Sequence, residues 1–492
     1  MRWASAAVVL PLALACCKDE GINPVPGPAI GYASGTRLHA RVRSSSPGAR
    51  LLVGWHDAKL GADCTFVTTD DGETRCAPSG ATIFYLDQLC SQPIAVVNPD
   101  CASAGAPPFA SAVFQSDIAC AGVTRAFRVG EPMDVPSPTR KVYVGAGASG
   151  GCLRSTHLDA TAQAYAVLAI DPGELAKATL TRTAKTDRLG LEVLVGDDGA
   201  RQARGLYDVT TRGRCFSIAG AIGGGEDRCI PDDLAWATYA ADATCSAPIA
   251  YQVRPTPSCP GASVVVSYGF DGCNVRASYF TPGVPVSIDD VFSGSAPVCT
   301  LLRRQTSLYE ELLRDHVFYE VGAPVAATTF APLKAQTTGF GRLQVPVLAA
   351  GDGTELAPAR PDTFFDATLG VPCRVYVFPD GLKRCVPRDA VAVATTSYAD
   401  LACTQEVVGL ASQPGCGTVT SPGYAVRVSG SACTTDITAT SVVTLGDVQT
   451  LSAYFTKSDS GACTRQAQGG IFASVAGEVP PSSLAVVTET VE

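Results

Sequence analysis

One cysteine-bearing segment occurs three times in this chain, and it limits the possible folds more than any other feature. The copies run from Trp55 to Ala95, from Tyr207 to Ala250 and from Phe365 to Val408. Each contains an aromatic residue or histidine followed by Asp, a Cys seven residues later, and the tetrapeptide Arg-Cys-x-Pro. Each also has a Tyr shortly before an Asp that precedes a third Cys by three residues. Because a recurring pattern of this kind indicates duplication of one structural unit, we expect three homologous modules.

The edges of the modules recur as well. Arg37-Leu38, Arg188-Leu189 and Arg342-Leu343 stand near the three starts. These edges predict β modules at 36–186, 187–340 and 341–492. Before them we expect a signal peptide at 1–15 and a lipidated cysteine with a flexible tether at 16–35, for reasons given below. The joints between the modules are short, which favours modules that pack against one another.

Local patterns within a module indicate β-structure. Apolar runs such as Leu51-Leu52-Val53 alternate with Asp-Gly pairs at 71–72 and 380–381, and Asp-Gly is typical of hairpin turns. The chain is also rich in Gly (48) and Pro (34). We predict an all-β fold. A weak half-repeat within each module favours six sub-units in a six-bladed β-propeller-like ring, and the alternative is three disulfide-stapled β-sandwich modules.

Twenty cysteines fit an oxidising compartment, provided that the chain is exported. Eighteen are predicted to form disulfides, six in each module: Cys64, Cys76, Cys90, Cys101, Cys120 and Cys152; Cys215, Cys229, Cys245, Cys259, Cys273 and Cys299; and Cys373, Cys385, Cys403, Cys416, Cys433 and Cys463.

Six cysteines permit fifteen pairings, and sequence alone does not choose among them. Our hypothesis is sequential pairing, first with second, third with fourth and fifth with sixth, because this closes short loops. A two-residue turn at 71–72 would place Cys76 opposite Val67 and not Cys64, so the first pair requires a strand that curls or else is wrong. The close Cys-x-x-Cys spacings of zinc or iron–sulfur sites do not occur.

The N-terminus has the features of an export signal. A short basic start is followed by an apolar segment from Ala4 to Ala15, and then by Cys16. The tetrapeptide Ala13-Leu14-Ala15-Cys16 resembles the bacterial lipoprotein box, which implies that Cys16 is the diacylated N-terminal residue. The alternative is an ordinary signal peptide. Cys17 and Lys18 follow where Asp would favour the inner membrane, so we expect the outer membrane or the cell surface.

Two acids recur in every module. Asp57, Asp208 and Asp366 precede the first Cys, and Asp87, Asp242 and Asp400 precede the third. We interpret them as caps that bond nearby backbone. The alternative is one calcium ion per module, with Asp57, Asp208 and Asp366 as candidate ligands. The arginines before each second Cys, Arg75, Arg228 and Arg384, are expected to pair with these acids. No other cofactor is predicted.

Two segments have the residue spacing of known functional motifs but lack the structural context that those motifs need. The segment 145–150 has the glycine spacing of a dinucleotide fingerprint, and 147–151 reads Gly-x-Ser-x-Gly. Both motifs need a strand–turn–helix context that this chain lacks, so we expect a hairpin tip there and no catalytic residues. Four histidines are present, His39, His56, His157 and His316, and no two occupy matching positions. The net charge of −9 argues against a nucleic-acid partner.

The repeated box and the lipobox together resemble uncharacterised cysteine-rich tandem-repeat bacterial lipoproteins. That resemblance covers nearly the whole mature chain and implies no particular activity. We expect a lipid-anchored, monomeric cell-envelope protein that binds or scaffolds an unidentified protein or glycan without catalysis. The alternatives are an extracellular hydrolase or lactonase with a central-channel site, and a structural adhesin.

Overall fold

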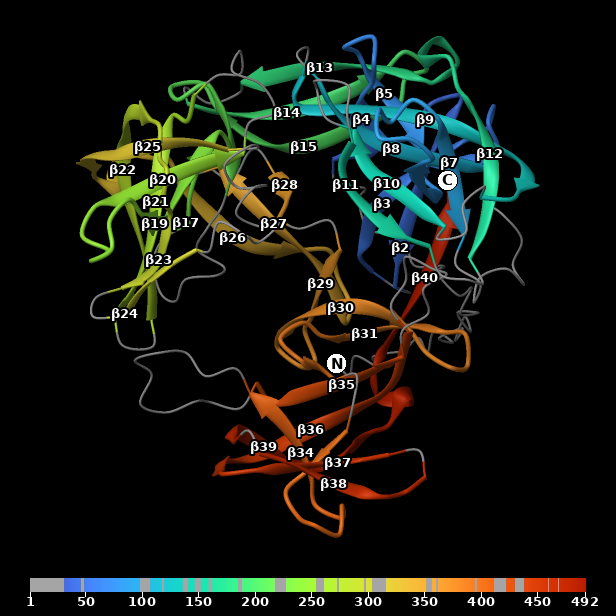
Figure 1. Cartoon of the computed structure of the whole chain (residues 1–492). Helices are drawn as coiled ribbons and strands as arrows, with labels where there is room; N and C mark the ends of the chain where they lie inside the picture. Colours follow the sequence, from blue (N-terminus) through green and yellow to red (C-terminus); the bar gives the residue numbers. More distant parts are fainter. Residues whose placement is uncertain are drawn as a thin grey trace, which may run out of the picture.

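A computed structural model describes most of the chain after residue 30. The described residues are 31–492 except 46–47, 98–106, 117–118, 136–139, 147–151, 159–161, 185–187, 217–226, 254–260, 272–273, 296–297, 303–315, 351–355, 360–361, 394–395, 411–421, 430–437, 459 and 468. The regular elements within them are β-strands and three short 3₁₀ turns, which confirms the all-β prediction. Three groups of strands follow one another along the chain, coloured blue to cyan, green to yellow and orange to red in Figure 1.

The first half of each module is an antiparallel sheet, here called the ring sheet. In module 1 it contains β2 (Leu38–Ser44), β3 (Arg50–Asp57), β4 (Ala62–Thr68) and β5 (Thr74–Pro78). In module 2 it contains β14 (Leu189–Gly196), β15 (Arg201–Asp208), β16 (Gly213–Phe216), β17 (Asp227–Arg228) and β18 (Ile230–Pro231). In module 3 it contains β27 (Leu343–Ala350), β28 (Leu356–Pro358), β29 (Thr363–Asp366), β30 (Val371–Val377) and β31 (Lys383–Pro387). A short strand, β1 (Tyr32–Ala33), pairs with β15.

Three link strands join these sheets into a closed ring. They are β13 (Lys177–Ala184), β26 (Pro332–Thr338) and β40 (Ala485–Val491), and each follows a 3₁₀ turn: η2 (Pro172–Glu174), η4 (Ala327–Thr329) and η5 (Pro481–Ser483). Each link strand pairs at its start with the last part of one sheet and along its length with the first strand of the next: β13 with β5 and β14, β26 with β17 and β27. The C-terminal strand β40 pairs with β31 and then with β2 near the N-terminus, so the ring closes (Figure 1).

The second halves of modules 1 and 2 each form a separate closed five-stranded barrel with an attached hairpin, whereas the second half of module 3 is joined to its ring sheet by a strand pairing. In module 1 the barrel strands are β6 (Ala81–Tyr85), β7 (Pro93–Val97), β8 (Phe109–Ser116), β9 (Ala119–Met133) and β12 (Gln163–Ala169), and the hairpin is β10 (Lys141–Ala146) with β11 (Cys152–His157). The cycle β6–β7–β12–β9–β8 closes by a parallel pairing of β8 with β6.

Module 2 repeats this cycle, and module 3 has similar pairings with two short strands in place of the first barrel strand. Module 2 uses β19 (Leu234–Ala240), β20 (Pro248–Val253), β21 (Val264–Asp271), β22 (Asn274–Val286) and β25 (His316–Val325), with the hairpin β23 (Phe292–Ser295) and β24 (Val298–Leu301). Module 3 uses β32 (Val391–Val393), β33 (Ser397–Tyr398), β34 (Glu406–Leu410), β35 (Tyr424–Ser429), β36 (Thr438–Leu451) and β39 (Gly470–Val479), with the hairpin β37 (Tyr454–Lys457) and β38 (Cys463–Gln466).

This pairing does not confirm the six-bladed propeller. The two halves of a module have different topologies, because the ring sheet is an antiparallel meander and the barrel needs a parallel strand pair. The weak half-repeat in the sequence therefore has no counterpart in the described sheets. The threefold repetition is present at the level of whole modules, whose residue boundaries stay a prediction. The glycine-rich segment behaves as predicted at its flanks, since β10 and β11 form a hairpin on either side of residues 147–151, which lie outside the described part.

The Asp-Gly turns and the register of β4 and β5 explain the first disulfide. Gly72 has φ 78°, which glycine adopts without strain, but the turn spans residues 69–73 and is longer than the predicted two residues. The longer turn sets Cys76 opposite Phe66 and Cys64 opposite Pro78, so both sulfurs lie on one face. Their Cα atoms are 5.3 Å apart, and they form a disulfide. Equivalent bonds join Cys215 to Cys229 and Cys373 to Cys385, which confirms the pairing of first with second cysteine.

The predicted pairing of third with fourth cysteine is wrong. Cys90 bonds Cys152, Cys245 bonds Cys299 and Cys403 bonds Cys463, which is third with sixth in every module. These bonds attach the hairpin of each barrel to the loop after the barrel's first strand. The predicted pairing of fifth with sixth cysteine is wrong as well, because the sixth is bonded to the third. The fourth and fifth cysteines lie outside the residues whose side chains are described. In the chain-entropy model a loop of about 60 residues contributes about 4 kcal/mol and one of about 12 contributes about 3 kcal/mol.

The buried cores of the ring sheets cross the module joints. The core of module 1 contains Trp55, Cys64 and Cys76 and takes in Ala200 of module 2. The cores of modules 2 and 3 take in Leu348 and Leu51 respectively, each from the module that follows in the ring. Apolar contacts of this kind stabilise the joints, because each sheet buries part of its surface on its neighbour. The modules therefore pack together as the short joints predicted.

Candidate functional site

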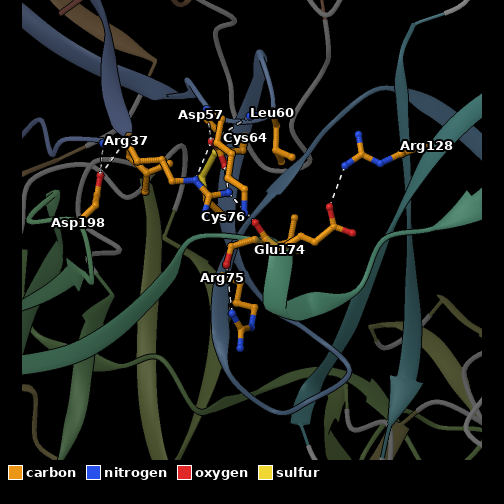
Figure 2. A network of polar contacts seen from close by, with 12 residues as sticks. Arg37, Asp57, Leu60, Cys64, Arg75, Cys76, Arg128, Glu174 and Asp198 are labelled. Atoms are coloured by element: carbon orange, nitrogen blue, oxygen red, sulfur yellow. Dashed lines mark hydrogen bonds and ion pairs between the residues drawn. A yellow bond between two sulfur atoms is a disulfide. The ribbon is translucent and has the colours of Figure 1, made fainter.

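The repeated aspartates were the first candidate site residues, and Asp57 shows what they do. Its side chain is fully buried at the end of β3. Arg37 donates from Nε and Nη2 to the two carboxylate oxygens at 2.8 and 2.6 Å, and the backbone N–H of Lys59 donates at 2.9 Å (Figure 2). A carboxylate with these partners is compensated inside the protein, which a buried charge requires.

The same ion pair recurs in the other two modules. Arg188 bonds Asp208 at 2.9 to 3.2 Å, and Arg342 bonds Asp366 at 2.9 and 3.0 Å. Both aspartates are fully buried, and each accepts a further bond from the backbone two residues later. The guanidinium faces the carboxylate oxygens that calcium would need, and its positive charge would repel a cation. The surroundings of Asp57, Asp208 and Asp366 thus favour the structural interpretation over the calcium alternative, and the described residues contain no cluster of three potential metal ligands.

In modules 1 and 2 a second contact ties the pair to the turn before the link strand. Arg37 Nη2 donates to the carbonyl of Glu174 at 2.6 Å, and Arg188 Nη2 donates to the carbonyl of Thr329 at 2.6 Å. Both carbonyls belong to 3₁₀ turns directly before link strands. The arginine therefore fastens the start of the module to its end, and we call each Arg–Asp–carbonyl set a module lock.

The arginines of the Arg-Cys-x-Pro box have other partners than predicted. Arg75 pairs with Asp71, and Arg384 pairs with Asp380, both within their own hairpin turns. Arg75 also donates to the carbonyl of Leu175 at 3.1 Å, and Arg228 donates to that of Phe330 at the same distance. The prediction that these arginines pair with the repeated acids is wrong. Asp57, Asp208 and Asp366 face the arginines of the Arg-Leu pairs, and Asp87, Asp242 and Asp400 accept from nearby backbone N–H groups.

The second set of aspartates caps a tight loop, as predicted. The carboxylate of Asp87 accepts from the backbone N–H groups of Leu89, Ser91 and Gln92 at 2.7 to 3.2 Å. Slight burial raises the pKa of Asp87, but these N–H groups outweigh it and the pKa is lowered overall. Cys90 has φ 53°, a strained value for a non-glycine residue, and this loop holds it for the disulfide.

The loops of modules 2 and 3 repeat this geometry. Asp242 accepts from the backbone of Thr244, Ser246 and Ala247, and Asp400 accepts from that of Thr404 and Gln405. The hydroxyl of Thr244 lowers the pKa of Asp242, and the hydroxyl of Thr404 lowers that of Asp400, in both cases with help from the backbone. The cysteines three residues on, at 245 and 403, also have positive φ.

Polar contacts join modules 1 and 2 near the turn between β14 and β15. The carboxylate of Asp198, between β14 and β15, accepts from the backbone N–H groups of Arg37 and Leu38 at 2.9 and 2.6 Å (Figure 2). Burial opposes ionisation of Asp198, yet these bonds lower its pKa. Nearby, the indole N–H of Trp55 donates to Oε1 of Gln202 at 2.8 Å. The lock residue Arg37 is thus held from both modules.

One cavity lies in the barrel of module 1, where β6, β8 and β10 diverge. Its volume is about 670 Å³. The lining combines apolar and hydroxyl-bearing residues: Thr82, Ile83, Phe84, Tyr85, Ser111, Ala112, Val113, Val144, Gly145, Ser155 and Thr156. Burial raises the pKa of Tyr85 to about 12, so this phenol stays neutral. A lining of this kind offers hydrogen bonds and apolar contact to a small neutral ligand.

Sequence reasoning missed the lock arginines as site residues, although their signal was present. Arg37, Arg188 and Arg342 recur at fixed places, and each lies 20 to 24 residues before its aspartate. In the sequence, these arginines were interpreted only as markers of where each module begins. The lipidation candidate Cys16 lies outside the described residues, and no helix among those described is long and apolar enough to span a membrane.

The fold and the module locks define a class, the disulfide-stapled all-β repeat proteins. The chain belongs to a family of unknown function (DUF7481), whose model matches residues 29–279 and 281–472. Neither the curated proteins nor the solved structures include a match to this chain. The six disulfides among the described residues are compatible with an extracellular protein.

Proposed function

We propose that this protein is a lipid-anchored component of the cell envelope that binds or scaffolds a protein or glycan without catalysis. The observation that carries the proposal is the buried Arg–Asp pair that recurs in all three modules. The recurring charged residues are engaged in buried bonds that hold the fold, as in Arg37 with Asp57, and they recur because each module needs them. A rigid closed ring of this kind suits a role in presenting surfaces or ligands outside the cell.

The cavity of the first barrel supports a binding role. Its lining includes the hydroxyl-bearing residues Thr82, Ser111 and Thr156 together with Phe84. Hydroxyl and aromatic side chains together suit a neutral sugar. A glycan array probed with the purified chain tests this, with Ala112→Trp as the variant that fills the cavity. Binding that survives the filled cavity would place the ligand elsewhere.

The hydrolase alternative has less support. It requires two close carboxylates in a pocket, or His157 or His316 beside acids. Within the described part of the chain, the cavity lining contains neither arrangement. His157 lies opposite Lys141 in the hairpin, and His316 stacks edge-on against Tyr251 at 5.2 Å between ring centroids.

The lipid anchor at Cys16, with residues 16–35 as tether and the outer membrane or cell surface as destination, rests on the lipobox resemblance. Labelling cells with a palmitate analogue tests it. The wild-type chain and Cys17→Ser should be labelled, and Cys16→Ser should lose the label because acylation needs that thiol. Equal labelling of all three chains would reject the anchor but leave the binding proposal standing.

A further inference from the structure

A row of polar side chains crosses the ring sheet of module 1 and is not repeated. His39 in β2 lies directly opposite His56 in β3, and His56 lies directly opposite Asp63 in β4. The matching register positions hold different residues elsewhere: Gly190, Tyr207 and Arg214 in module 2, and Gln344, Phe365 and Pro372 in module 3. A requirement of the fold would appear in every copy, so this row serves another purpose.

The row lies on the face of the sheet away from the core. Along β2 the buried residues are Leu38 and Ala40, and along β3 and β4 they are Trp55 and Cys64. Since side chains alternate between faces, those of the row lie on the opposite face. The side chains of His56 and Asp63 are 32% and 44% exposed, so a dissolved ion can reach them.

Hydrogen bonding fixes which nitrogen of His56 is available. Its Nδ1 lies 3.1 Å from Oδ1 of Asp63. An ionised carboxylate only accepts, so Nδ1 carries the hydrogen and Nε2 of the neutral ring keeps its lone pair. Histidines that bind metals are commonly oriented in this way by a carboxylate behind them.

Asp63 is held in this supporting position by Arg41. Nη1 of Arg41 lies 2.7 Å from Oδ2 of Asp63, and Arg41 also bonds Glu489 of the closing strand. Both carboxylate oxygens of Asp63 are thereby engaged. Asp63 is a positioning residue for the His56 ring, and the two histidines supply the free nitrogens.

We propose that His39 and His56 form a binding site for a divalent transition metal such as Zn²⁺, Ni²⁺ or Cu²⁺. The Cβ atoms of directly opposed residues lie about 4.5–5.5 Å apart, which lets two imidazoles reach one ion. Imidazole suits these metals, and Cu²⁺ should bind most tightly. No third His, Cys, Asp or Glu of the described chain completes a metal cluster with them, which leaves coordination positions for water or a group from a partner.

Isothermal titration of the tag-free mature chain with Ni²⁺ and Zn²⁺ tests the site. One equivalent should bind, and His39→Gln and His56→Gln should each weaken binding at least about 10-fold. Asp63→Asn should weaken it about 10- to 100-fold, the range usual for such supporting carboxylates. His157→Gln is the matched control and should bind as the wild type does. Unchanged affinity in both row-histidine variants, or an equal loss in the control, would overturn the proposal.

Electron paramagnetic resonance of the Cu²⁺ form separates a direct ligand from an indirect effect. The wild type should show coupling to two imidazole nitrogens, and each single histidine variant should show one. Asp63→Asn should keep both couplings at saturating Cu²⁺, since this residue only positions His56. A spectrum unaltered by loss of both row histidines would contradict the assignment. Thermal unfolding without metal confirms that each variant is folded.

Discussion

Arg37 and Asp57 form a two-point ion pair whose carboxylate is fully shielded from solvent, while Nη2 of Arg37 also bonds the carbonyl of Glu174. One side chain thus joins the start of a module, its second strand and the turn before its link strand. Removal of one partner from such a pair leaves an uncompensated charge, which is far more destabilising than the net contribution of the intact pair.

We predict that Asp57→Asn lowers the free energy of unfolding by about 3 kcal/mol, because it leaves the Arg37 guanidinium unpaired. Asp208→Asn and Asp366→Asn should act similarly. The measurement is urea unfolding followed by circular dichroism. Glu174→Gln is the control, since its carboxylate pairs with Arg128 at the surface where both side chains are 44% exposed, and it should cost less than about 1 kcal/mol. Similar small losses in all variants would contradict the locks.

Calcium should leave the melting temperature of the wild-type protein unchanged at millimolar concentration. The reason is that the carboxylates of Asp57, Asp208 and Asp366 face arginines and backbone N–H groups, not open oxygen-lined sites. Differential scanning calorimetry with calcium or a chelator provides the comparison. An upward shift that disappears in Asp366→Asn would restore the calcium hypothesis.

The disulfide pairing can be read directly from the protein. Digestion without reductant should yield linked peptides containing Cys64 with Cys76, and Cys90 with Cys152. The double replacement of Cys90 and Cys152 by Ser should lower stability by about 4 kcal/mol in the chain-entropy model, since their loop spans 62 residues. Peptides that join Cys90 to Cys101 would favour sequential pairing.

Acid should weaken the closure of the ring. Burial raises the pKa of Glu489 on β40, but Lys383, Arg41 and Arg43 outweigh it and lower the pKa from 4.5 to about 2. A lowered pKa in the folded state means that the ionised group stabilises the protein above about pH 4.5, and that this contribution is lost as the pH falls toward 2.

Comparison of wild type with Glu489→Gln isolates this effect. The difference in melting temperature should be largest above about pH 5 and should shrink toward zero near pH 2, because protonation then makes the two side chains alike. Thermal melts across this range supply the measurement. A difference that does not vary with pH would show that Glu489 acts through packing alone.

The sequence predicted the all-β fold, the three modules and the short disulfide, because these follow from local patterns. The Asp-Gly turns and the Arg-Cys-x-Pro box lie within one hairpin, so their geometry needs no distant contact. The bond of Cys90 to Cys152 was not predictable in this way. Loop-closure reasoning favours short loops, whereas closure of the barrel brings a hairpin 62 residues away beside Cys90.

The lock arginines and the histidine row illustrate the same limit. Arg37 and Asp57 stand 20 residues apart, and only the pairing of β2 with β3 brings them together. His39 and His56 looked unrelated in the sequence because no other module repeats them. Strand register, which one residue of turn length can alter, decides both contacts.

The last strand of the chain, β40, closes the ring by pairing with the first ring strand, β2. Ser44 on β2 lies directly opposite Thr488 on β40, with Oγ of Ser44 3.1 Å from Oγ1 of Thr488. The double variant Ser44→Cys with Thr488→Cys should therefore form an additional disulfide, seen as a linked peptide joining the two ends of the chain. We expect near-complete cross-linking in the folded protein, and two free thiols at these positions would contradict a closed ring.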